Sequence, residues 1–297
     1  MDPRFRGDAG EGLMPVITDS KVLKDAIAAL KGADFVAIDT EFARRNTYYA
    51  KLCLVQVAGA GQAFAVDPLA PGLNMKPLLK LLKSRKILKV FHSAREDVEV
   101  IYHSLGVMPK SLFDTQIAAS LLGYGAAVSY AGLLETLTGL ALDKTQRYSD
   151  WRKRPLRPEQ IEYALADVIH LREIYAILSR ELQVKNLNKT AKLTMKKLLE
   201  RKRYANNPKL AWEKIGSRSM SDTEIKRLKK LGAWREKKAQ EIDIPRQWVV
   251  KDILLRKIAR LGKNFPEMLE RDKELQSLFR ENKVSRRFLD ELEELMQ

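Results

Sequence analysis

The chain has 297 residues, of which 45% are hydrophobic, and a formal net charge of +16. This length predicts a globular protein with about two domains. The charge favours a polyanionic partner such as nucleic acid, with a solvated lysine-rich surface as the alternative. Cys53 is the single cysteine, which excludes an intramolecular disulfide and a cysteine-rich zinc site.

The sequence carries no membrane or export signal that we recognise. No apolar stretch approaches the roughly 20 residues that cross a bilayer, and the N-terminus lacks the apolar centre of a signal peptide. We therefore expect a cytoplasmic protein without a membrane partner. Its positive charge is concentrated in residues 191–297, which hold 28 of the 54 Lys and Arg but 17 of the 38 Asp and Glu.

The first half of the chain has the pattern of a mixed sheet. Residues 1–13 are rich in glycine and charge and are predicted to be a disordered extension, before a short amphipathic helix that begins at Asp19 and Ser20. Short gaps favour an antiparallel meander for the first three strands, and a longer helical segment favours a parallel crossover to the fourth. The predicted strands are the apolar runs at 35–38, 52–57, 63–66 and 87–91.

From residue 93 onward the pattern is almost entirely helical, and Asn206-Asn207-Pro208 interrupts it. Ser221 and Glu224 have the spacing of a capping box, which predicts a helix running to about residue 242. The expected fold class is α/β, with a mixed-sheet domain followed by a small all-α helical bundle. The predicted parts are a mixed-sheet domain at 14–190, a linker helix at 191–206, a helical nucleic-acid-binding domain at 207–285 and a helical tail at 286–297.

Two acidic residues end the first predicted strand. Asp39 and Glu41 flank Thr40, and the two-residue period of a strand puts both carboxylates on one face. Carboxylates held this close repel each other, so a divalent cation with oxygen ligands is one resolution. A pair of exposed acids at the end of a strand is the alternative.

Two further positions join this pattern from helices. Asp97 falls in the first turn of the helix after the fourth strand, behind a capping-box spacing of Ser93 and Glu96. The helix dipole alone also favours an acid there. Tyr163 and Asp167 are four residues apart and share one face of a later helix, although an ordinary amphipathic helix would give the same spacing.

Together these residues resemble a known enzyme family. The triple Asp39-Thr-Glu41, the stretch from Lys89 through His92 to Asp97, and Tyr163-Ala-Leu-Ala-Asp167 resemble the three motifs of the four-acid 3′→5′ exonuclease superfamily, tyrosine subtype. Residues 146–160, with Asp150-Trp151 and Arg154-Pro155, are similar to the segment that precedes the third motif in ribonuclease D. The resemblance covers roughly residues 14–190.

The resemblance implies a ribonuclease H-like fold and a metal-dependent site. Asp39, Glu41, Asp97 and Asp167 would hold two Mg²⁺ or Mn²⁺ ions, and Tyr163 would orient the attacking water. Phe42 would stack on the terminal base, with core packing as the alternative. Trp151 and Arg154 would line the substrate groove, with packing between the two domains as the alternative.

The C-terminal region resembles the helical domain shared by RecQ helicases and ribonuclease D. Its apolar positions, among them Trp212, Leu228 and Leu255, would form the core, and the Lys and Arg between them would meet phosphates. The 31 residues after Pro266 are too few for the second copy of this domain that ribonuclease D often carries. A shorter chain is expected either to hold RNA more loosely or to rely on a partner.

The function that the resemblance implies is trimming of RNA from its 3′ end. Hydrolysis with two metal ions would release nucleoside 5′-monophosphates from structured RNA with single-stranded 3′ ends, such as transfer RNA precursors. A 3′→5′ DNA exonuclease is one alternative, because the metal site does not sense the 2′-hydroxyl. A non-catalytic nucleic-acid-binding protein is the other, and a monomer is the expected state.

Overall fold

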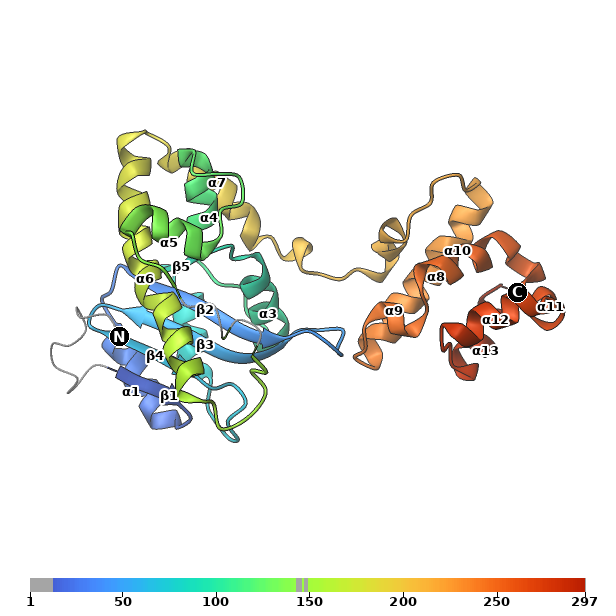
Figure 1. The fold of residues 1–297 in the computed structure, drawn as a ribbon, viewed down its shortest axis with the longest axis horizontal. Helices are drawn as coiled ribbons and strands as arrows, with labels where there is room; N and C mark the ends of the chain where they lie inside the picture. Colours follow the sequence, from blue (N-terminus) through green and yellow to red (C-terminus); the bar gives the residue numbers. More distant parts are fainter. Residues whose placement is uncertain (1–12, 143–145, 147–148, 297) are drawn as a thin grey trace. The chain divides into compact units, whose positions relative to one another are not determined.

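The computed structural model describes residues 13–142, 146 and 149–296, so the extension expected at 1–13 lies almost wholly outside the described residues. Contacts divide the chain into two compact units, of which one contains Ala50–Tyr204 and the residues up to Ala43. The other contains Arg44–Tyr49 and the chain from Ala205 onward. We call them the sheet unit and the helical unit (Figure 1).

The sheet unit is built on one six-stranded sheet with the order β1-β4-β3-β2-β5-β6. Antiparallel pairing joins β2 to β3 and β3 to β4, whereas β2 and β5 are parallel, which confirms the predicted meander and crossover. The strands are β1 (Leu13–Ile17), β2 (Phe35–Ala43), β3 (Lys51–Gly59), β4 (Gln62–Val66), β5 (Leu88–Phe91) and β6 (Leu112–Asp114). We did not predict β1 and β6, which form the two edges of the sheet.

Helices cover both faces of this sheet. Ala37 of β2 packs in an apolar cluster with the first half of α6 (Pro158–Val184), while its neighbours Val36 and Ile38 belong to a larger second cluster that includes three helices from the first part of the chain. This alternation follows from the two-residue period of a strand. The three helices are α1 (Ser20–Ala29), α2 (Lys76–Lys83) and α3 (Arg95–Leu105). In Figure 1, α6 crosses the sheet.

The remaining helices of the sheet unit pack around α6. They are α4 (Thr115–Leu122), α5 (Tyr130–Thr138) and α7 (Asn188–Lys196), followed by the 3₁₀ turns η2 (Lys197–Leu199) and η3 (Arg201–Arg203). We predicted a linker helix at 191–206. In the structure Ala191, Met195 and Tyr204 are buried in the core of the sheet unit, and the division between the units falls after Tyr204.

The helical unit has its own core. It comprises η4 (Pro208–Lys214), α8 (Asp222–Glu241), α9 (Arg246–Val249), α10 (Asp252–Leu261), η5 (Gly262–Asn264), α11 (Phe265–Arg271), α12 (Lys273–Glu281) and α13 (Arg286–Met296). Ser221 and Glu224 form the predicted capping box of α8. Leu228 and Leu255 are fully buried in the core, as expected. None of the described helices is long and apolar enough to cross a membrane.

Candidate active site

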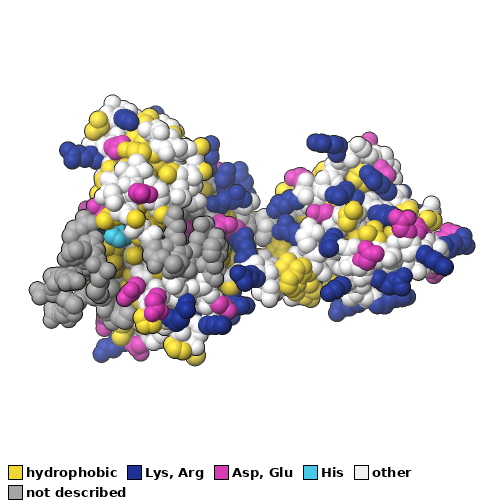
Figure 2. Space-filling model, viewed as in Figure 1, with side chains coloured by type: hydrophobic (Ala, Val, Ile, Leu, Met, Phe, Trp, Pro, Cys, Tyr) yellow, Lys and Arg dark blue, Asp and Glu magenta, His cyan; other side chains and the backbone are white. Residues whose placement is uncertain are grey.

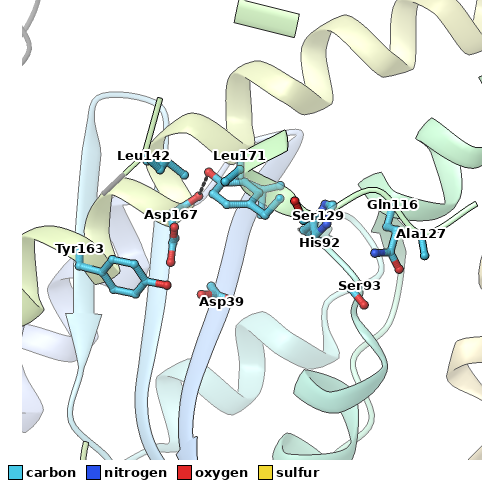
Figure 3. Close-up of a pocket in the computed structure, with 12 residues that line it drawn as sticks. Asp39, His92, Ser93, Gln116, Ala127, Ser129, Leu142, Tyr163, Asp167 and Leu171 are labelled. Atoms are coloured by element: carbon cyan, nitrogen blue, oxygen red, sulfur yellow. Dashed lines mark hydrogen bonds between the residues drawn. The ribbon is translucent and has the colours of Figure 1, made fainter. Parts of the chain in front are cut away.

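Three carboxylates converge where the C-terminal half of β2 meets α6. Asp39 and Glu41 project from β2, and Asp167 projects from α6, which packs on that face of the sheet. Carboxylate oxygens of the three residues lie within 4.8 Å of one another. Figure 3 shows Asp39 and Asp167 facing each other across the end of a pocket. Residues 128 positions apart in sequence therefore form one acidic cluster.

The surroundings of the cluster oppose negative charge. Burial and then the charge of Asp167 raise the pKa of Asp39 to about 8. Burial, together with the neighbouring acids, raises the pKa of Glu41 to about 10. The pKa of Asp167 is raised to about 7 by burial. Burial and repulsion between the acids are the two causes of these raised pKa values. A divalent cation between the carboxylates would remove both, because it replaces the solvation lost on burial and cancels the repulsion.

The donor set fits a hard divalent ion. All three groups offer oxygen ligands, which Mg²⁺ and Mn²⁺ prefer. None of the ion pairs among the described residues involves Asp39, Glu41 or Asp167. The geometry and the charge of this site therefore match a metal centre.

Asp97 lies beside the cluster but is held by Thr40. The Thr40 hydroxyl donates to Asp97 Oδ1 at 2.5 Å, and both side chains are 6% exposed. Burial and then the charge of Asp39 raise the pKa of Asp97 well above its ordinary value. Asp97 is outside the group of three that meets the 4.8 Å distance. Because Oδ1 of Asp97 accepts from Thr40, the other carboxylate oxygen, Oδ2, is the one available to bind a cation.

Asp97 falls in the first turn of α3, as predicted, but the predicted capping box of that helix is wrong. Ser93 does not cap α3, because Ala94 stands at the N-cap without a side-chain hydrogen bond. Ser93 instead adopts a positive φ of 56°, and its N–H donates to Asp114 Oδ1 at 3.1 Å. Asp114 is the N-cap of α4, and it therefore ties the starts of α3 and α4 together.

Tyr163 stands one helical turn before Asp167 and donates a hydrogen bond to its carboxylate. Burial and the nearby carboxylates raise the pKa of this phenol, so it is neutral around pH 7. Trp151 is 3% exposed, and its ring centroid lies 6.3 Å from that of Tyr163. The structure thus shows Trp151 packing behind Tyr163 within the sheet unit, and substrate contact by Trp151 stays a prediction.

Arg154 does not point its guanidinium freely into the pocket. Its Nε and Nη2 donate to both oxygens of Asp67 at 2.6 and 2.7 Å, and its remaining hydrogen bonds go to the carbonyls of Cys53, Trp151 and Lys153. The bidentate pair fixes the 151–154 segment against β3 and the residue after β4. Packing thus accounts for Arg154, and substrate contact by it stays a prediction.

The pocket next to the acids has a volume of about 390 Å³. Beyond Asp39, Tyr163 and Asp167 it is lined by polar side chains that include His92, Gln116 and Ser129 (Figure 3). Both ring nitrogens of His92 are engaged, at 3.0 Å from Thr115 Oγ1 and 3.2 Å from the Val128 carbonyl. Burial lowers the pKa of His92, which supports a neutral, structural imidazole. Phe42 is half-buried and packs against the main core.

Two residues near the acids escaped our sequence analysis. Tyr130 donates from its hydroxyl to the Asp167 carbonyl at 2.5 Å. Gln56 lies opposite Asp39 in the register of β2 and β3, and it is fully buried. Neither amide atom of Gln56 has a hydrogen-bond partner among the described residues. The sequence feature that could have identified Gln56 is a single amide side chain inside β3, which is otherwise apolar from Leu52 to Gly59.

Known proteins share both parts of this architecture. The 3′-5′ exonuclease family matches residues 14–183, and the HRDC domain family matches residues 224–289. Ribonuclease D of Bartonella henselae is 42% identical over 247 residues, which is 83% of this chain and 61% of that protein. Two further curated relatives are also ribonuclease D proteins. The chain spans between 61% and 67% of the length of these three relatives.

Two solved structures extend the comparison. RNase D of Escherichia coli, described as an exoribonuclease involved in structured RNA processing, is 29% identical with a TM-score of 0.83, and the match covers 94% of this chain and 74% of that one. NrnC of Brucella melitensis with bound Mg²⁺ is 34% identical with a TM-score of 0.53, and the match covers 59% of this chain and 86% of that one.

Proposed function

Because the chain belongs to the ribonuclease D family of 3′-5′ exonucleases, we propose that it is a 3′→5′ exoribonuclease. Its substrates are structured RNAs with single-stranded 3′ tails, such as transfer RNA precursors, and its products are nucleoside 5′-monophosphates. The observation that carries the proposal is the cluster of Asp39, Glu41 and Asp167, whose oxygens lie within 4.8 Å.

The residues of the cluster would hold two Mg²⁺ or Mn²⁺ ions, with Asp97 as the fourth ligand. When bound, the ions supply the charge that activates the attacking water and stabilises the leaving 3′ oxygen. Thr40 keeps the Asp97 carboxylate oriented through its hydrogen bond. A cation is supported because the raised pKa values of the acids mark a site that disfavours unneutralised charge.

Tyr163 orients the attacking water rather than removing its proton. A phenol with a raised pKa keeps its proton at neutral pH, so it offers one donor and one acceptor in fixed positions. The hydrogen bond to Asp167 and the packing of Trp151 restrict its ring. Phe42, at the end of β2, keeps its proposed role in stacking on the terminal base.

The helical unit supplies affinity for the phosphate backbone. Lys226, Lys229 and Lys230 are exposed on α8, and Lys229 lies over the Trp212 ring at 4.7 Å from its centroid. Such cations release counterions from RNA when they bind phosphates. Figure 2 shows Lys and Arg spread over the visible face of this unit, with acidic side chains between them.

The test is a time course on a 3′-tailed RNA labelled at its 5′ end, with Mg²⁺, with Mn²⁺ and with a chelator. We expect a ladder of products that shorten by one nucleotide, formed only when metal is present. A matched DNA strand run in parallel decides between RNA and DNA. Intact RNA with every metal, together with a gel shift, would show a binding protein without catalysis and refute the proposal.

A further inference from the structure

A second cavity in the sheet unit lies apart from the acidic cluster. It has a volume of about 1060 Å³ and is formed by the loops before β5 and β6, the second half of α6, and α7 with the turns that follow it. We call it the α7 groove. None of its lining residues also lines the pocket that contains Asp39 and Asp167.

The charge of the α7 groove is of one sign. Its described lining contains no Asp or Glu, and none of its Lys or Arg forms an ion pair with another described residue. All of these cations are exposed. They are Arg85, Lys86, Lys110, Lys192, Lys196 and Arg201. Figure 2 shows basic side chains on the flank of the sheet unit where Figure 1 draws α7.

Repulsion between these positive charges lowers the stability of the folded protein. Lys192 and Lys196 are one helical turn apart on α7, a like-charge spacing that destabilises a helix. A polyanion in the groove would relieve that repulsion. The floor between the cations includes the half-buried rings of Phe113 and Tyr175, which pack edge to face with centroids 4.9 Å apart. Cations beside aromatic rings are the usual elements of a groove that binds single-stranded nucleic acid.

The wall that carries three of the cations is held in place by hydrogen bonds. Lys89 is fully buried, and its ammonium donates to the carbonyls of Ser84 and Ile87, which fixes the turn that presents Arg85 and Lys86. Ser111 Oγ donates to the Arg85 carbonyl at 2.9 Å. The Lys110 N–H donates to the Leu82 carbonyl at 2.9 Å. A wall of this kind loses little entropy when a ligand binds.

We infer that the α7 groove binds the phosphodiester backbone of the RNA substrate at a distance from its 3′ end. This inference rests on the proposed function and adds a second contact to it. Asp167 and Tyr175 are eight residues apart on α6, which is about 12 Å along the helix axis. At the spacing of about 3.4 Å per nucleotide that stacked bases have within one strand of a duplex, roughly four nucleotides cover this distance, so a strand of about 20 nucleotides occupies the groove while a very short oligonucleotide fills little or none of it.

Substrates of different length therefore distinguish binding at the α7 groove from binding at the acidic cluster. The test variant is Lys192→Gln with Lys196→Gln, and the matched control is Lys24→Gln with Lys31→Gln, two exposed lysines outside both cavities. KM and kcat are measured on a trinucleotide and on a single strand of about 20 nucleotides. Binding of the longer strand is measured by fluorescence anisotropy in a chelator, so that it does not depend on catalysis.

Each phosphate contact on a single strand contributes about fivefold in affinity at roughly 0.1 M salt, so loss of two contacts raises KM and Kd for the longer RNA about 25-fold. The trinucleotide keeps its KM, kcat is unchanged on both substrates, and the control variant matches wild type. Unchanged Kd in the groove variant, or an equal loss in the control, overturns the inference. A wild-type enzyme that cleaves neither RNA refutes the proposed function instead, while the anisotropy result still decides the groove.

Discussion

Replacing Asp39 by Asn is expected to stabilise the metal-free protein while abolishing its activity. Burial and Asp167 raise the Asp39 pKa from 3.8 to about 8, so the ionised carboxylate disfavours the folded state above pH 4. At 1.36 kcal/mol per pKa unit, the cost at pH 8 is roughly 2–5 kcal/mol once solvent screening is allowed for. The amide of Asn keeps the shape of the side chain but carries no charge.

Differential scanning fluorimetry in a chelator at pH 8 measures this effect. We expect the Tm of Asp39→Asn to exceed that of wild type by at least roughly 5 °C, because about 2–4 °C accompanies each kcal/mol in a protein of this size. The difference shrinks as pH falls towards 4, where both states of wild type bind the proton. A lower Tm for the variant at pH 8 would refute the argument from repulsion.

Adding metal should remove much of the difference in stability between the two proteins. Mg²⁺ or Mn²⁺ at about 100 times its Kd adds roughly 2.7 kcal/mol to the stability of wild type, which is about 5–10 °C. The variant gains little, and its kcat on tailed RNA falls by about 10²–10⁴-fold, since one carboxylate of the metal site is missing. Activity close to wild type in Asp39→Asn would contradict the metal-site assignment.

Three further predictions test the surroundings of the cluster. Thr40→Val removes the hydroxyl that holds Asp97, which should cost about 1.5–3 kcal/mol in urea unfolding and weaken metal affinity in calorimetry; an unchanged affinity would exclude Asp97 from the site. Tyr163→Phe should lower kcat about 10²-fold with KM unchanged, and a KM effect alone would show substrate binding instead. Arg154→Met leaves Asp67 buried without its partner, so we expect about 3–5 kcal/mol lost stability, whereas a change confined to KM would restore the substrate-binding role.

Periodicity and spacing predicted most of the sheet and the face on which the acids lie. β2, β3, β4 and β5 stand where apolar runs were found, and the gaps between them indicated their pairing. The edge strand β1 was missed because Pro15 interrupts its apolar run and its first residue fell in the predicted extension, and β6 was missed because it has only three residues. A short strand of this kind is defined by its partner, β5, rather than by its own pattern.

The candidate site was predicted from motifs, but its supporting contacts were not. The link from Thr40 to Asp97 spans 57 residues, and that from Arg154 to Asp67 spans 87. Such pairs have no local spacing that a sequence pattern can detect. Gln56 could have been flagged, since a single amide within a buried strand needs a reason. Roles for individual residues therefore required the three-dimensional contacts.

The distribution of the acids along the chain also bears on when the protein becomes active. Asp39 and Glu41 leave the ribosome long before Asp167, and α6 must pack on the sheet before the three carboxylates meet. A nascent chain that ends before α6 holds two acids but cannot complete the cluster. If the proposed function is right, the cluster therefore forms only after α6 has been synthesised and has packed on the sheet.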